Sequence, residues 1–176
     1  MSTPSTADEE KTSSIAVKPP NRPTWDETRI AMARVLAQRS LCVRDKVGAI
    51  IVDKDDKIIG EGYNGPARYT KHDQRPCTDW CPRSKMRNPD VLVAGYDNCP
   101  SLHAEANALM ASDRSLRVGG VIYVTSHPCL SCAKLISNSG LTGVYVGHDG
   151  QHQYRRDEAV YSYLMNLGIR VWEFQI

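Results

Sequence analysis

Two short motifs combine residue types that bind metal ions with a residue type that moves protons. His103 and Glu105 form an H-x-E motif, and Cys129 and Cys132 form a C-x-x-C motif directly after Pro128. Two cysteines at this spacing at the start of a helix can put both sulfurs on one ion, because the helix N-terminus favours the thiolate that metals need. With His103 as third ligand, zinc would keep one position for water and lower the pKa of that water toward neutrality. Glu105 is better placed to carry protons than to bind the metal.

The order of the two motifs adds to their specificity. H-x-E followed by P-C-x-x-C is the signature of zinc-dependent nucleobase deaminases. The alternative is a structural zinc site built from His103 and the two cysteines. That site would need a fourth protein ligand close by and would give Glu105 no role. The combination favours a catalytic centre, in which Glu105 takes a proton from water and delivers it to a substrate nitrogen.

The elements that position these residues follow from capping and hydrophobic patterning. Thr24 and Glu27 fit a capping box at the start of a first helix. The apolar, β-branched residues 47–52 predict a buried strand, and residues 57–63 return to form a hairpin. Further elements are expected as a helix over 103–112, a strand over 121–125, a helix from 129 to 140, a strand over 144–147, a helix over 157–167 and a strand over 169–174. Helices that alternate with strands predict a sheet with helices packed on its faces.

Length and composition limit the class of protein. The 176 residues suffice for one domain with a real core. Residues 1–23 are rich in Ser, Thr, Pro and charge, which predicts a disordered tail before a single domain over 24–176. The net charge of +2 is too small to indicate nucleic-acid binding by itself. No apolar run has the length of a membrane span or a signal peptide, so we expect a cytoplasmic protein with reduced cysteines.

Residues 25–172 resemble the deoxycytidylate (dCMP) deaminase family of the cytidine deaminase-like superfamily. The resemblance is carried by the strand 47–52, by GEGYNGP at 60–66, by HAEANA at 103–108 and by the segment 123–136. It implies an α/β fold with three α-β-α layers, in which a mixed central sheet of about five strands carries helices on both faces. It also implies zinc-dependent hydrolysis of dCMP to dUMP and ammonia, which supplies the precursor of dTTP.

The resemblance further implies substrate contacts. Asn64 matches a family asparagine that contacts the sugar, although an Asn-Gly pair is also ordinary turn chemistry. Tyr154 resembles a family tyrosine in the loop before the last helix. Arg44, Lys46 and Arg155 lie in loops that could flank a pocket and donate to the phosphate, while an ordinary solvated side chain is the better interpretation for each of these three.

Regulation and assembly are implied in the same way. Family enzymes are often homohexamers that dCTP activates and dTTP inhibits, with Mg²⁺ accompanying the nucleotide effector. The effector site of the family lies near the Y-N-G turn, which corresponds here to Gly62, Tyr63, Asn64 and Gly65.

A second cysteine group precedes His103. Some family members carry a structural zinc in this region, and Cys77, Cys81 and Cys99 would supply three sulfurs. A closed structural site needs a fourth ligand, for which His72 is the nearest candidate. A long loop with few apolar residues also gains stability from a metal. The alternative is three ordinary reduced thiols.

Other functions remain open at this point. The substrate could be a 5-substituted dCMP, or adenosine in tRNA, although the low net charge argues against RNA. From another class of protein, the chain could be a zinc-stapled binding module without catalysis. Glu105 distinguishes these alternatives, because a module needs no carboxylate beside the metal.

Overall fold

One mixed sheet organises the chain, which the computed structural model describes over residues 22–72, 74–86, 99–149 and 156–175. The strands are β1 (Gly48–Val52), β2 (Ile58–Tyr63), β3 (Val121–Val124), β4 (Gly143–His148) and β5 (Arg170–Gln175). Their order across the sheet is β2-β1-β3-β4-β5. β1 pairs antiparallel with both β2 and β3, whereas β3, β4 and β5 run parallel. The predicted hairpin and the predicted mixed sheet of five strands are confirmed.

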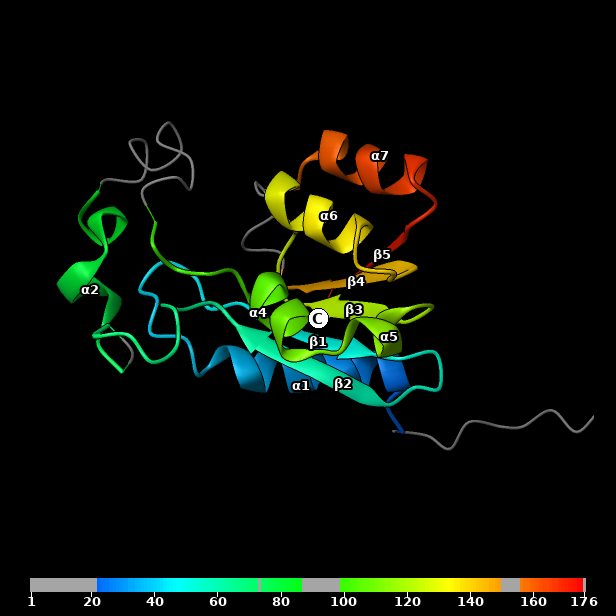
Figure 1. Ribbon diagram of the computed structural model, residues 1–176, viewed down its shortest axis with the longest axis horizontal. Coiled ribbons are helices and arrows are strands. Elements are labelled where there is room, and N and C mark those ends of the chain that lie inside the picture. The colour runs from blue at the N-terminus through cyan, green and yellow to red at the C-terminus, as the bar shows by residue number, and fades with distance from the viewer. Residues whose placement is uncertain (1–21, 73, 87–98, 150–155, 176) are drawn as a thin grey trace, which may run out of the picture.

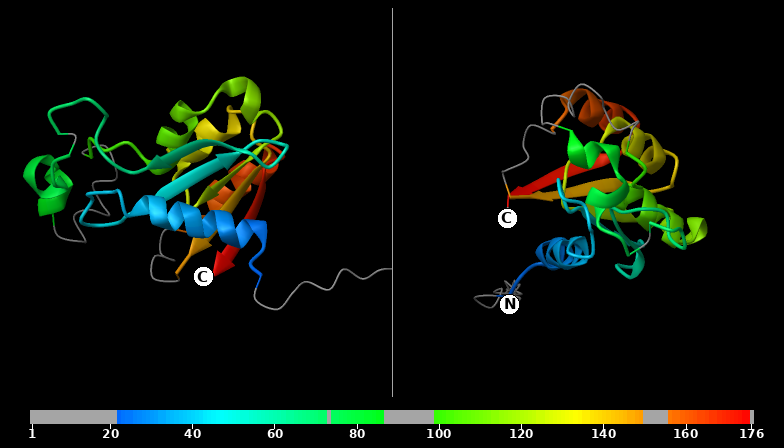
Figure 2. Two further views of the ribbon diagram at one scale, coloured as in Figure 1. Left: turned by 90° about the horizontal axis from the view of Figure 1, so that it is seen from below. Right: turned by 90° about the vertical axis from the view of Figure 1, so that its left-hand side faces the viewer.

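Helices cover both faces of this sheet (Figure 1). The longer ones are α1 (Trp25–Ala37), α4 (Ala104–Ala111), α6 (Leu130–Ser137) and α7 (Glu158–Asn166). α1 lies alone on one face, and α4, α6 and α7 lie on the other (Figures 1 and 2). The three-layer prediction is therefore confirmed. The short α2 (Cys77–Trp80), the 3₁₀ helix η1 (Pro82–Lys85) and α5 (Arg114–Arg117) were not expected, since four residues are too few to show a helical period.

A separate core lies on each side of the sheet. Beneath α1, the core consists of Ile30, Ala33, Ile50, Val52 and Tyr123. On the opposite face, the core includes Ile51, Ala108, Ile122, Ile136, Val144 and Leu164. Alternate residues of β1 thus serve the two cores, because successive side chains of a strand point to opposite faces. A strand covered on both faces explains why residues 47–52 are apolar without interruption.

Two glycines of β2 let α4 lie directly against the strand backbone. A Cβ added at Gly62 would come within 2.3 Å of the Ala104 carbonyl oxygen and 2.4 Å of the Ala108 nitrogen. A Cβ at Gly60 would come within 2.7 Å of the Ala108 oxygen. The G-x-G spacing puts both positions on the same face of β2. This close contact sets the height of α4, and hence of His103 and Glu105, above the sheet.

The start of α1 has the predicted capping box. The Thr24 side chain accepts a hydrogen bond from the Glu27 nitrogen at 3.2 Å, and the Glu27 carboxylate accepts one from the Thr24 nitrogen at 2.5 Å. A disordered tail was predicted over residues 1–23. Of these, residues 1–21 lie outside the described residues. Within the described ranges, no helix has both the length and the apolar character that a membrane crossing requires.

Candidate metal centre and active site

Three predicted metal ligands meet where two helices begin. His103 is the N-cap of α4, Cys129 is the N-cap of α6, and Cys132 follows in the first turn of α6. The His103 Nδ1 atom lies 3.5 Å from the Cys129 Sγ and 3.3 Å from the Cys132 Sγ. Two ligands on one tetrahedral zinc ion, with bonds of about 2.0 and 2.3 Å, lie about 3.5 Å apart. The distances between these side chains therefore fit zinc.

In the described part of the chain, no other group of potential metal ligands converges as closely as these three residues. There they form the one cluster of at least three His, Cys, Asp or Glu residues whose ligand atoms all lie within 4.8 Å of one another. Cys132 is buried, whereas His103 and Cys129 are half-buried. A metal ion held here would thus be protected on one side and reachable by a small molecule on the other.

The two sulfurs differ strongly in acidity. A hydrogen bond with Cys132 lowers the pKa of Cys129 to about 4 against the effect of burial, and His103 adds to the lowering. The hydrogen bond with Cys129 raises the pKa of Cys132, as do burial and the charge of Glu105. Cys129 is therefore the more acidic of the two thiols. Metals bind cysteine as the thiolate, so metal binding at this pair releases protons.

Glu105 lies in the first turn of α4 beside this centre. Its side chain is buried, with 4% exposure. Burial raises the pKa of Glu105, because a carboxylate loses hydration there, and the charge of His103 opposes the shift. A raised pKa makes a carboxylate a stronger base, which suits a group that has to accept a proton. The predicted proton carrier is therefore next to the predicted metal ligands.

A cavity of about 150 Å³ opens at the carboxyl ends of β3 and β4. It is lined by residues that include Arg34, Asp45, Lys46, Ser126, His127 and His148. The segment that contributes Ser126 and His127 continues through Pro128 into the metal ligand Cys129. Ligands of open α/β sheets bind at the carboxyl ends of strands, which fits this place. The predicted substrate contact Lys46 lies in the wall of the cavity.

Two residues of this cavity wall could not be identified from the sequence. Arg34 is on α1, far along the chain from the metal ligands, and nothing in its local sequence marks it. His148 is the last residue of β4. Its ring lies 5.1 Å from the ring of His127, whose Nδ1 is 2.6 Å from the Tyr161 hydroxyl. The cavity wall thus carries two cations, Arg34 and Lys46, two carboxylates, Asp45 and Asp149, and the two histidines.

Asn64 connects the Y-N-G turn to the loop before β1. Its side-chain oxygen accepts a hydrogen bond from the Val47 nitrogen at 2.8 Å, and its amide nitrogen donates one to the Asp45 oxygen at 2.9 Å. Both groups of the amide are therefore used to hold the loop that carries Lys46. The sugar contact implied by the resemblance stays a prediction, and the structure adds a positioning role.

The other predicted phosphate contacts have different positions. The Arg44 guanidinium donates from Nε to the Arg83 oxygen at 2.8 Å and also donates to the Met86 oxygen. It therefore binds the backbone around η1, which leaves its substrate role untested. Tyr154 and Arg155 lie outside the described residues.

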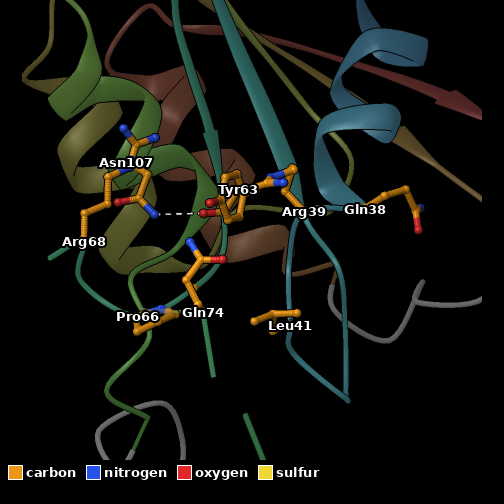
Figure 3. Close-up of a pocket in the computed structure, with 9 residues that line it drawn as sticks. Gln38, Arg39, Leu41, Tyr63, Pro66, Arg68, Gln74 and Asn107 are labelled. Atoms are coloured by element: carbon orange, nitrogen blue, oxygen red, sulfur yellow. Dashed lines mark hydrogen bonds between the residues drawn. The ribbon is translucent and has the colours of Figure 1, made fainter. Parts of the chain in front are cut away.

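A second cavity, of about 190 Å³, lies beside the Y-N-G turn (Figure 3). Of the four predicted effector residues, Tyr63 and Gly65 line it, whereas Gly62 is covered by α4. Arg39 and Arg68 also line it, and the Arg39 guanidinium lies 6.0 Å from the centre of the Tyr63 ring. The Asn107 amide donates to the Tyr63 oxygen at 2.8 Å, drawn as a dashed line in Figure 3. The two arginines therefore make this cavity cationic, and the hydrogen bond from Asn107 connects its wall to α4.

The second cysteine group lies in the segment around α2, which projects from one end of the sheet (Figures 1 and 2). Cys77 and Cys81 are buried, and the sulfurs of Cys81 and Cys99 lie 4.0 Å apart. His72 stacks on Trp80 at 5.0 Å, and its buried Nδ1 has no hydrogen-bond partner among the described residues. These ligand atoms do not converge as closely as those at His103, since within the described ranges only the latter group meets the 4.8 Å limit.

Cys42 is a neighbour of this group that the sequence interpretation missed. The Leu41 oxygen accepts a hydrogen bond from the Cys77 nitrogen at 3.3 Å, which places the residue after Leu41 beside α2. Burial, together with the adjacent sulfurs of Cys81 and Cys42, raises the pKa of the Cys77 thiol to about 12.

Comparison with known proteins identifies the family. A model of the cytidine and deoxycytidylate deaminase zinc-binding region matches residues 23–148. The chain belongs to this family. A deoxycytidylate deaminase of Mycobacterium phage D29 is 41% identical over 128 residues, which cover 70% of this chain and 94% of that protein. The human deoxycytidylate deaminase is 35% identical over 141 residues, covering 80% of this chain and 73% of the human protein.

Longer relatives and solved structures agree with this membership. A deoxycytidylate deaminase of Saccharomyces cerevisiae is 35% identical over 156 residues, and the match spans 46% of its length, so the chain matches about half of the yeast protein. The crystal structure of a dCMP deaminase from the cyanophage S-TIM5, in complex with dCMP and dUMP, superposes with a TM-score of 0.64 at 27% identity. It covers 87% of this chain and 98% of the cyanophage chain.

Proposed function

We propose that this deaminase family member catalyses the zinc-dependent hydrolysis of dCMP to dUMP and ammonia. The observation that carries the proposal is the group of His103, Cys129 and Cys132 beside the buried carboxyl of Glu105. The similarity to deoxycytidylate deaminases over most of the chain supports dCMP as substrate. The cyanophage relative with bound dCMP and dUMP supports a nucleotide substrate and product as well.

Each residue of the centre has a distinct part in this reaction. His103, Cys129 and Cys132 would hold zinc, which when bound supplies a Lewis acid that makes hydroxide available near neutral pH. Glu105 accepts the proton released when water becomes the nucleophile. It then donates a proton to the exocyclic nitrogen of the base, which leaves as ammonia. Burial of Glu105 supports this role, because a raised pKa makes the carboxylate a stronger base.

We assign the nucleotide to the cavity at the ends of β3 and β4, because its lining residues Ser126 and His127 lead directly into Cys129. Arg34 and Lys46 line this cavity and suit a phosphate, which prefers charged donors. Asn64 supports the loop that carries Lys46 and, by the family resemblance, contacts the sugar. Tyr154, Arg44 and Arg155 stay predicted contacts.

Further properties follow from the resemblance and form part of the proposal. A second, structural zinc would bind Cys77, Cys81 and Cys99, with Cys42 preferred to His72 as fourth ligand because Leu41 contacts Cys77. dCTP and dTTP, with Mg²⁺, would act at the cationic cavity beside Tyr63. A homohexamer, a cytoplasmic location and a single domain over 24–176 stay predictions from the sequence.

The decisive experiment compares the wild-type protein with Glu105→Gln. Purified protein is mixed separately with dCMP, deoxycytidine, CMP and 5-methyl-dCMP, and the loss of cytosine absorbance is followed while bound zinc is measured by elemental analysis. We expect turnover of dCMP, and a fall of about 10²–10⁴-fold in kcat for Glu105→Gln with the zinc content unchanged. Removal of zinc with a chelator should abolish turnover, and added zinc should restore it.

Other outcomes would contradict parts of the proposal. Turnover of deoxycytidine without dCMP would exclude phosphate recognition while keeping the chemistry. Preference for 5-methyl-dCMP would redefine the substrate. No turnover of any of these compounds by the zinc-loaded protein would refute the proposal and favour RNA adenosine or a non-catalytic module.

A further inference from the structure

A buried hydroxyl in the wall of the cavity at the ends of β3 and β4 has no hydrogen-bond partner among the described residues. Ser126 is 6% exposed and lines the cavity at the end of β3. Its Oγ is fully enclosed, yet it makes no hydrogen bond to any described residue. Since Ser126 directly follows Thr125 at the end of β3, its backbone position is set by the sheet. The Thr125 hydroxyl, for comparison, accepts a hydrogen bond from the Gly48 nitrogen at 3.0 Å.

The other buried serines of the described chain have partners. Ser40 is fully buried, and its Oγ accepts from the Cys42 nitrogen at 3.2 Å. Ser139 is 5% exposed, donates to the Ile136 oxygen at 2.6 Å and accepts from the Leu141 nitrogen at 3.3 Å. Buried polar groups in native proteins are nearly always hydrogen-bonded, because an unsatisfied one costs free energy. Ser126 therefore stands out, and the cavity that this residue lines is where a ligand can approach its side chain.

The position of Ser126 in the cavity indicates which part of a ligand it meets. Arg34 on α1 and Lys46 in the loop before β1 provide the cations. Ser126 and His127 belong to the segment that runs into the metal ligand Cys129. A phosphate favours the cations, so the uncharged part of a nucleotide is left for the serine side. A hydroxyl suits that part, because it both donates and accepts hydrogen bonds.

We propose that the Ser126 hydroxyl makes a hydrogen bond to the base or sugar of the nucleotide that fills this cavity, which makes Ser126 a specificity-determining residue. This inference rests on the proposed function, because it takes the cavity as the nucleotide site. It assigns to Ser126 a role in binding and none in proton transfer. The competing explanation is that ordered water satisfies the hydroxyl and that no nucleotide atom does.

The test compares Ser126→Ala with the matched control Ser139→Ala. Thermal unfolding gives the stability of each variant, calorimetric titration with dUMP gives the affinity for the product nucleotide, and initial rates with dCMP give kcat and KM. For Ser126→Ala we expect an unchanged or higher Tm, because the substitution removes an unsatisfied buried hydroxyl. We expect dUMP to bind about tenfold more weakly, which corresponds to one hydrogen bond, with a matching rise in KM for dCMP.

Ser139→Ala should behave in the opposite way. It removes two internal hydrogen bonds far from the cavity wall, so its Tm should fall while its affinity for dUMP stays that of wild type. Opposite effects of the two substitutions on Tm and on dUMP affinity would distinguish a contact with the ligand from a structural role. Bound zinc is measured in all samples, so that a change in metal content cannot imitate a change in affinity.

The inference fails if Ser126→Ala binds dUMP as tightly as wild type, which would assign the hydroxyl to water. It also fails if Ser126→Ala loses as much Tm as Ser139→Ala, which would give the hydroxyl an internal partner. In both cases a wild-type protein that turns over dCMP leaves the proposed function intact. A wild-type protein that neither turns over dCMP nor binds dUMP overturns the proposed function and this inference together.

Discussion

Replacement of Gly62 by alanine should displace α4, the helix that carries Glu105, the proposed proton carrier. The added Cβ would lie 2.3 Å from the Ala104 oxygen and 2.4 Å from the Ala108 nitrogen. Both atoms belong to the backbone of α4, so no side-chain rotation can make room. An ordinary separation of non-bonded atoms is about 3.5 Å, so α4 has to retreat from β2 by about 1 Å.

The expected losses follow from this shift. His103 caps α4 and Glu105 is in its first turn, so both move with the helix. A displacement of about 1 Å at a reacting group can lower the rate by about 10²-fold. Insertion of a methyl group into a closely packed contact costs about 1–3 kcal/mol. For a chain of this size, each kcal/mol lowers Tm by about 2–4 °C.

Thermal unfolding and dCMP turnover measure the two effects. Gly65→Ala serves as the control for stability, because its Cβ would meet nothing nearer than the Tyr63 ring at 3.7 Å. Gly60→Ala adds a second comparison. Its Cβ would contact the far end of α4, at 2.7 Å from the Ala108 oxygen, so it should reduce stability with a smaller loss of kcat. The reasoning is refuted if Gly62→Ala is as stable as Gly65→Ala and as active as wild type.

Four further substitutions test the remaining structure. Asn64→Asp places a carboxylate oxygen against the Asp45 carbonyl, where an amide now donates at 2.9 Å, and we expect a loss of about 1–3 kcal/mol in thermal unfolding. Cys42→Ser should remove one zinc equivalent by elemental analysis, whereas His72→Asn should not; the reverse result would restore His72 as the fourth ligand. Thr24→Ala removes the cap of α1, so we expect a loss of about 1 kcal/mol with kcat/KM for dCMP unchanged. An altered kcat/KM would show that the start of α1 influences the site.

The metal centre could be predicted from the sequence because its geometry is mostly local. Cys129 and Cys132 are one helical turn apart, so the start of α6 alone brings their sulfurs together. His103 and Glu105 likewise both belong to the start of one helix, as the N-cap and a first-turn residue of α4. Only the distance between the two helices depends on the fold, and that was implied by the resemblance. The strands β1 and β3 could be predicted for a similar reason, since each is a continuous apolar run.

Contacts between distant loops could not be predicted in this way. Arg34 lines the cavity from α1. The apolar pattern of α1 predicts which side of the helix is buried, but it does not predict what the polar side contacts. The neighbourhood of Cys42 and Cys77 depends on a backbone hydrogen bond between two loops. Asn64 was interpreted as a ligand contact or a turn residue, and its bonds to the loop before β1 were missed because sequence does not show loop partners. The packing role of Gly62 could not be predicted either. The glycine is the one sequence feature that relates to the close contact between α4 and β2, and it does not show which element lies against it.

The loop between α1 and β1 joins these separate observations. At its start, the Leu41 oxygen accepts from Cys77, and in its middle Arg44 donates to the Arg83 oxygen at 2.8 Å. At its end, Asn64 holds the backbone on both sides of Lys46. The loop is therefore fixed to the cysteine segment, to the Y-N-G turn and to the cavity wall. A zinc ion among the cysteines would stiffen the segment on which this loop rests, and so would act on nucleotide binding through the position of Lys46 while leaving the proton transfers at Glu105 unchanged.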